Sequence, residues 1–127
     1  MATVAILNTN QDTVEALRLA FEQHGFETVS THIDEIKRGA SDLLEFLKTH
    51  DPRAVVWDIA PPYDHNWTFL KLVCTSTAMH GRVVVATTTH KANLERLVGP
   101  TEAMEIIGKP YDLEQVVQAV KRGLGNG

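Results

Sequence analysis

Four short, nearly continuous apolar runs constrain the fold of this chain more than any other feature of its sequence. The runs lie at 4–7, 54–57, 83–86 and 104–107, the last broken once by Glu105. Such runs are typical of strands that are covered on both faces, as in parallel sheets. A fifth segment, 27–31, is more polar and is predicted to be an edge strand.

Segments with helical periodicity separate these runs. Their apolar positions are Val14, Leu17 and Phe21; Leu43, Leu44 and Leu47; Trp67, Leu70, Val73 and Cys74; and Leu113, Val116, Val117, Val120 and Leu124. A shorter pattern at Leu94, Leu97 and Val98 predicts a further helix, ended by Gly99-Pro100.

Several residues predict where these helices begin and end. Gly25 stands where the first helix needs a C-terminal cap, and Ser41 is predicted to cap the second. Asp112 and Gln115 have the spacing of a capping box for the last helix.

The order of elements is therefore strand then helix, repeated five times. Such alternation predicts right-handed crossovers and a parallel α/β sheet with helices on both faces. In an open sheet of this type, ligands bind at the carboxyl ends of the strands. The residues at those ends are the candidate site.

Composition narrows the function classes. The chain has 127 residues and a net charge of −4, which suits a single domain, predicted over 1–124 with a flexible tail at 125–127. The single cysteine, Cys74, rules out an internal disulfide and suits a reducing compartment. The sequence has no run of Lys and Arg that would favour binding to nucleic acid. No apolar run is long enough to span a membrane, and the N-terminal residues lack the pattern of a signal peptide. A cytoplasmic protein is predicted.

Polar residues follow the predicted strands. Asn8 and Thr9 end the first, Asp58 ends the third, Thr87 ends the fourth, and Lys109 follows the fifth. This carboxylate, hydroxyl and ammonium suit phosphoryl transfer, in which Asp58 attacks phosphorus while Thr87 and Lys109 stabilise phosphoryl oxygens.

Over essentially its whole length the chain resembles the CheY-like receiver domain of bacterial two-component response regulators. The segments that carry the resemblance are Trp57-Asp58 with Pro61-Pro62, Ala86-Thr87-Thr88 after an apolar run, and Gly108-Lys109-Pro110-Tyr111 before a capped helix. The spacing of Asp58, Thr87 and Lys109 also agrees with that family.

The resemblance implies a five-stranded sheet in the order 2-1-3-4-5 and a role for each matching residue. Asp58 stands at the position that accepts a phosphoryl group from a phosphohistidine kinase, Thr87 at the strand-four hydroxyl, and Lys109 at the lysine that often precedes a cis proline. The backbone carbonyl of Ala60 stands at a magnesium-ligand position. A sensor histidine kinase or another signalling protein is the implied partner, and a homodimer is also compatible.

Two positions depart from the family pattern. Receivers end the first strand with two acidic metal-binding residues, whereas this chain has Asn8 and Thr9. Because Mg²⁺ prefers charged oxygen ligands, weak or absent magnesium binding is expected, unless Asp12 reaches back through water. Ile106 replaces the aromatic residue that many receivers place three positions before the lysine, which breaks the usual coupling of hydroxyl and aromatic ring.

The sequence is compatible with three functions. In the first two, which it favours, the chain is predicted not to be an enzyme. The leading one is a degenerate receiver that acts through protein–protein contacts, most directly at the face of helix four, strand five and helix five. The first alternative is a working Mg-dependent phosphoacceptor that uses Asp58. The second is a small flavodoxin-like enzyme or nucleotide binder, although the chain has no Gly-rich phosphate loop after its first strand. His65 and His90, in the loops after strands three and four, are not predicted to be catalytic.

Overall fold

A five-stranded parallel sheet forms the centre of the protein. The computed structural model describes residues 2–8, 10–33, 42–89, 91–92, 96 and 104–125. Within them the strand order is β2-β1-β3-β4-β5, as predicted, and every neighbouring pair is parallel. The polar strand β2 lies at one edge, as its sequence predicts.

The elements alternate along the chain as the apolar runs indicate. They are β1 (Thr3–Asn8), α1 (Gln11–Gln23), β2 (Glu27–His32), α3 (Leu43–His50), β3 (Ala54–Ile59), α4 (Tyr63–Cys74), the 3-10 helix η1 (Thr77–Met79), β4 (Val83–Thr88), β5 (Met104–Gly108) and α6 (Leu113–Gly123). The helix predicted at Leu94, Leu97 and Val98 lies outside the described residues, and of the predicted tail only Gly125 is described.

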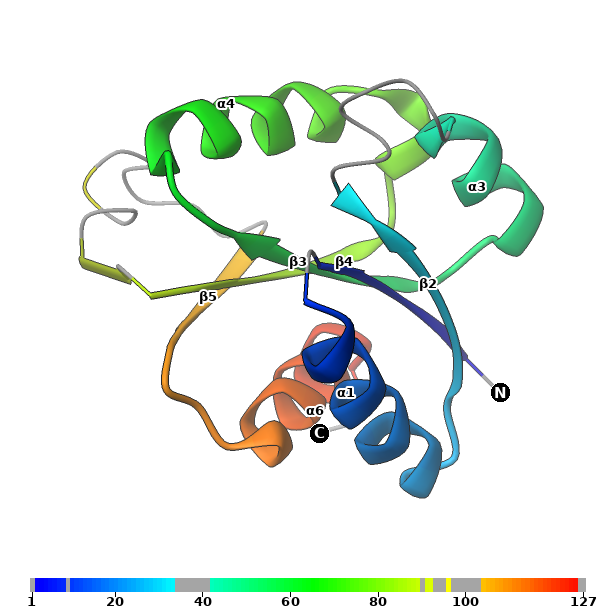
Figure 1. The fold of residues 1–127 in the computed structure, drawn as a ribbon. Coiled ribbons are helices and arrows are strands. Elements are labelled where there is room, and N and C mark those ends of the chain that lie inside the picture. The colour runs from blue at the N-terminus through cyan, green and yellow to red at the C-terminus, as the bar shows by residue number, and fades with distance from the viewer. Residues whose placement is uncertain are drawn as a thin grey trace.

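Helices cover both faces of the sheet, with α3 and α4 on one side and α1 and α6 on the other (Figure 1). Each face has its own buried core, because successive strand residues point to opposite sides. Trp57 and Leu70 belong to the core under α3 and α4. Phe21 and Val117 belong to the core under α1 and α6.

Local capping sets the helix ends. Asp112 and Gln115 form the predicted capping box at α6. Gly25 follows α1 with a φ of 85°, a left-handed conformation that glycine adopts without strain. The predicted cap of α3 is wrong: Asp42 is the N-cap residue, and its side chain accepts hydrogen bonds from the backbone of Leu44 and Glu45. Both Ser and Asp can cap a helix, and here the carboxylate of Asp42, one residue after Ser41, accepts these hydrogen bonds.

Strand register brings distant residues together at the carboxyl edge. Asp58 pairs with Thr87 in the β3–β4 register, and Thr88 pairs with Gly108 in the β4–β5 register. The site therefore lies where three neighbouring strands end.

Among the described residues, no helix is long and apolar enough to cross a membrane.

Candidate functional site

Asp58 is the centre of the site. It lies on β3, in which all six residues are buried, and its own exposed fraction is 6%. A carboxylate so far from water must be paired or hydrogen-bonded to stay charged. Its partners therefore define what the site can do.

Two donors converge on one oxygen of this carboxylate. The Thr87 hydroxyl donates to Asp58 Oδ1 at 2.8 Å, and Lys109 Nζ lies 2.5 Å from the same atom. Thr87 is buried, whereas the Lys109 side chain is 27% exposed. The structure thus joins the three residues that the sequence predicted as the core of the site.

The backbone around Lys109 holds it at the end of β5. Its N–H donates to the Thr88 carbonyl at 2.7 Å. The Lys109–Pro110 peptide bond is cis, as the family resemblance implies. The backbone hydrogen bond to Thr88 thus places Lys109 one strand away from Thr87 and two strands away from Asp58.

Asn8 is buried at the end of β1, and its side chain bonds locally. Its Oδ1 accepts a hydrogen bond from the backbone N–H of Asn10 at 2.9 Å. Asn10 in turn caps α1 by accepting from the backbone of Asp12 and Thr13. The polar residues after β1 thus start α1. Thr9 lies outside the described residues, and the reach of Asp12 toward the site stays a prediction.

The Ala60 carbonyl is hydrogen-bonded by a residue that the sequence analysis did not place in the site. Asn66, the fourth residue of α4, donates from Nδ2 to this oxygen at 2.7 Å. No sequence pattern signals this contact, because it depends on how the loop between β3 and α4 turns back. Asn66 is therefore a site residue that the structure alone identifies.

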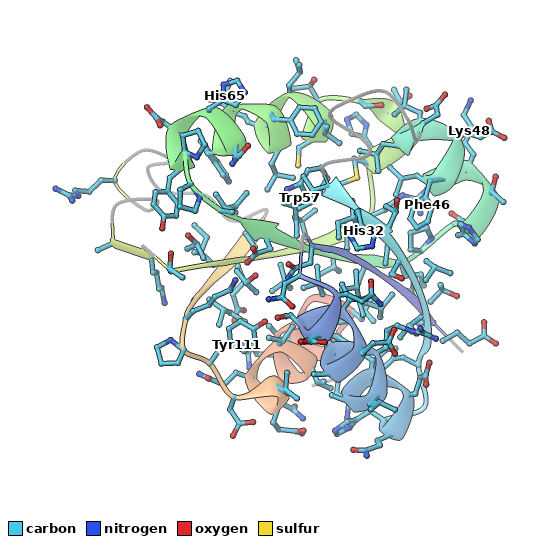
Figure 2. The ribbon with its side chains drawn as sticks, in the orientation of Figure 1. His32, Phe46, Lys48, Trp57, His65 and Tyr111 are labelled. Atoms are coloured by element: carbon cyan, nitrogen blue, oxygen red, sulfur yellow. The ribbon has the colours of Figure 1, made fainter. Side chains whose placement is uncertain are left out.

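Tyr111 is a second residue that the sequence analysis did not single out for the site. Its hydroxyl oxygen is buried, and this atom has no hydrogen-bond partner among the described residues. Burial, and then the negative charge of Asp58, raise the pKa of this phenol. Tyr111 packs with the core under α1 and α6, on the side of the sheet opposite Trp57 (Figure 2).

Ile106 and His65 lie in surroundings other than those of the Asp58, Thr87 and Lys109 side chains. Ile106 is half-buried and packs against the core under α3 and α4. Its stiff aliphatic side chain offers no ring to swing. The predicted loop position of His65 is wrong, because this residue lies in α4 and is exposed on the outer side of that helix (Figure 2). His90 lies outside the described residues.

Among the described residues, the site offers a magnesium ion few of the ligands that it requires. The described residues hold no group of three or more His, Cys, Asp or Glu side chains able to share a metal. Asp58 is the carboxylate at the site, and its Oδ1 already accepts from Thr87 and faces Lys109. The Ala60 carbonyl accepts from Asn66. Mg²⁺ requires close to six oxygen ligands in octahedral order, usually with carboxylate charge.

These features define the class of fold. Solved structures of response regulator, receiver and CheY proteins match the chain over at least 96% of its length. A response regulator from Thermotoga maritima has a TM-score of 0.76 at 17% identity, over 98% of each chain. A receiver protein from Sinorhizobium medicae has a TM-score of 0.72 at 20% identity, over 98% of this chain and 94% of that one. The chemotaxis protein CheY4 of Vibrio cholerae has a TM-score of 0.70 at 18% identity, over 96% and 98%.

The chain therefore has the CheY-like receiver fold that its sequence motifs indicate. No family profile and no curated protein sequence matches it. Since the identities are low, this likeness establishes the fold, and function must be argued from the site.

Proposed function

We propose that this protein is a receiver-like signalling domain that acts through protein–protein contacts while Asp58 carries no phosphoryl group. The observation that carries the proposal is the Lys109–Asp58 ion pair. The other metal-ligand positions of the site are Asn8, Thr9 and the hydrogen-bonded carbonyl of Ala60. A sensor histidine kinase or another signalling protein is the partner class that this fold favours.

The charge at the site supports an unphosphorylated working state. An aspartate that accepts a phosphoryl group must approach an anionic donor, so the charge on both must be offset. A divalent cation usually does this, with acidic ligands to hold it. Here Lys109 already neutralises Asp58, and the acidic pair expected at Asn8 and Thr9 is missing. Transfer to Asp58 is therefore expected to be very slow.

The surface beside β5 and α6 is the proposed contact face. Arg122 on α6 and Glu105 on β5 form an exposed ion pair, with 2.6 Å between Arg122 Nη2 and Glu105 Oε2. Exposed pairs of this kind contribute little to stability, so both side chains remain able to exchange partners. A signalling partner with charged groups of both signs fits this face.

Intact mass after incubation with a small-molecule phosphodonor and Mg²⁺ tests the proposal, with Asp58→Asn as the control. The expected result is no phosphoryl adduct on the wild type at any Mg²⁺ concentration. Phosphate release from the donor is measured in parallel, because rapid hydrolysis would hide an adduct. Equal release by the wild type and Asp58→Asn supports the proposal. An adduct, or faster release, that depends on Asp58 overturns it and establishes the working phosphoacceptor instead.

A further inference from the structure

Asn66 bonds twice to the loop that carries the magnesium-ligand position. Its backbone N–H donates to the Pro62 carbonyl at 3.0 Å, which starts the α4 ladder. Its side-chain Nδ2 reaches further back, to the Ala60 carbonyl at 2.7 Å. The side chain is partly buried. One residue on α4 thus fixes the direction in which the Ala60 carbonyl points.

The first turn of α4 is tied to the other side of the site as well. Tyr63 precedes Asn66 by three residues and so lies on the same side of the helix. Its hydroxyl forms a short hydrogen bond with the Thr89 hydroxyl, just after β4. The loop that follows β3 and the residue that follows β4 are therefore both hydrogen-bonded to the first four residues of α4.

We propose that Asn66 is a positioning residue whose carboxamide occupies the place of a divalent cation at the Ala60 carbonyl. Together with Lys109 at Asp58, it keeps the site in one arrangement without a metal. The inference deepens the proposed function, because it identifies what holds the site when no cation is bound.

The physical basis is competition for the same oxygen. A carbonyl oxygen has two lone pairs, so one hydrogen bond does not saturate it. A magnesium ion must, however, approach to about 2.1 Å with its own octahedral shell. An amide nitrogen at 2.7 Å occupies part of that space. Cation entry then requires the Asn66 bond to break, and the observed affinity is lowered by the cost of breaking it.

Mg²⁺ titration of the folded protein tests the inference. The backbone amide shifts of Asp58, Ile59 and Ala60 give an apparent Kd for the wild type and for Asn66→Ala. The Asp58→Asn variant gives the background from unrelated surface sites. We expect Asn66→Ala to bind Mg²⁺ about fivefold more tightly, the factor for one net hydrogen bond that no longer has to break.

Thr68→Ala is the matched control. Thr68 lies on the same helix and its hydroxyl bonds within that helix, to the Asp64 carbonyl at 2.8 Å. The Mg²⁺ affinity of the Thr68→Ala variant is expected to equal that of the wild type. Asn66→Ser serves as a second variant if Asn66→Ala fails to fold, since the shorter side chain does not reach the carbonyl.

An affinity of the folded Asn66 variant within twofold of the wild type, or weaker, overturns the inference. So does the absence of Asp58-dependent Mg²⁺ binding in both proteins. Neither result affects the proposed function, which depends on whether wild-type Asp58 accepts a phosphoryl group. Conversely, a phosphoryl adduct on the wild type overturns the proposed function whatever the Mg²⁺ affinities are.

Discussion

Lys109 Nζ lies 2.5 Å from Asp58 Oδ1, although strand β4 separates the two strands that bring these residues together. The ion pair therefore spans the carboxyl edge of the sheet from β3 to the end of β5. It neutralises a carboxylate that is almost completely buried. Both the stability of this edge and its chemistry depend on the pair.

Lys109→Met should destabilise the protein by about 2 kcal/mol, measured by urea unfolding at pH 7. Methionine keeps the length of the side chain but leaves Asp58 without its cation, and an uncompensated buried charge is costly. The loss is smaller than for a fully buried pair because Lys109 is partly exposed. Adding Asp58→Asn should recover part of it.

Lys71→Met, at an exposed position of α4, is the control and should change the free energy of unfolding by less than about 0.5 kcal/mol. If the Lys109→Met variant were as stable as this control, solvent and not the lysine would be compensating the negative charge of Asp58.

Thr87→Val should cost about 1.5 kcal/mol, because valine has nearly the same shape but cannot donate to Asp58 Oδ1. Thr87→Ser keeps the hydroxyl and should lose less than Thr87→Val. Thermal unfolding of the three proteins side by side measures the difference. Equal losses in the two variants would assign the effect to packing rather than to the hydrogen bond.

The Tyr111 phenol should titrate above the ordinary tyrosine range. Burial, and then the Asp58 charge, raise its pKa, so the folded state favours the neutral phenol. Its contribution to stability is fully present below the unfolded tyrosine pKa of about 10 and is lost as pH rises through the folded pKa. Ultraviolet absorbance of phenolate in Tyr63→Phe isolates Tyr111, because the chain has two tyrosines.

Two variants separate the causes of this shift. Asp58→Asn should move the Tyr111 midpoint back toward the ordinary value, since it removes the charge but not the burial. Tyr111→Phe should leave stability unchanged or raise it by up to about 1 kcal/mol, because the hydroxyl it removes has no hydrogen-bond partner among the described residues. A midpoint at or below that of free tyrosine would contradict the assignment.

Arg82→Lys should destabilise the protein by about 2 kcal/mol, away from the site. The guanidinium donates to the carbonyls of Ala78 and Pro52, at 2.7 and 2.5 Å, and to the Asp51 carboxylate at 2.9 Å. Lysine cannot reproduce this planar set of bonds. Arg53→Lys, at an exposed neighbouring position, is the control in the same urea series. Equal stability of the two variants would show that the bonds of Arg82 contribute nothing net.

Features with a local cause could be predicted from the sequence. The apolar runs identified the strands because a strand buried on both faces needs apolar residues in succession. The capping box of Asp112 and Gln115 was predictable because both partners lie within one turn of helix. The cap of α3 shows the limit of this reasoning. Ser41 and Asp42 are neighbours of similar capping ability, and backbone geometry selects the aspartate.

The sequence by itself determined the alternation of strands and helices and the three residues at the strand ends, Asp58, Thr87 and Lys109. Their contact follows once parallel strands align their carboxyl ends. Only the tertiary structure decided that Asn66 donates a hydrogen bond to the Ala60 carbonyl. It also decided that the Tyr111 hydroxyl is buried, and that the charge of Asp58 helps to raise its pKa. These relationships depend on how a loop turns and how a side chain packs between layers. Neither leaves a periodic pattern in the chain, so the order of residues does not reveal them.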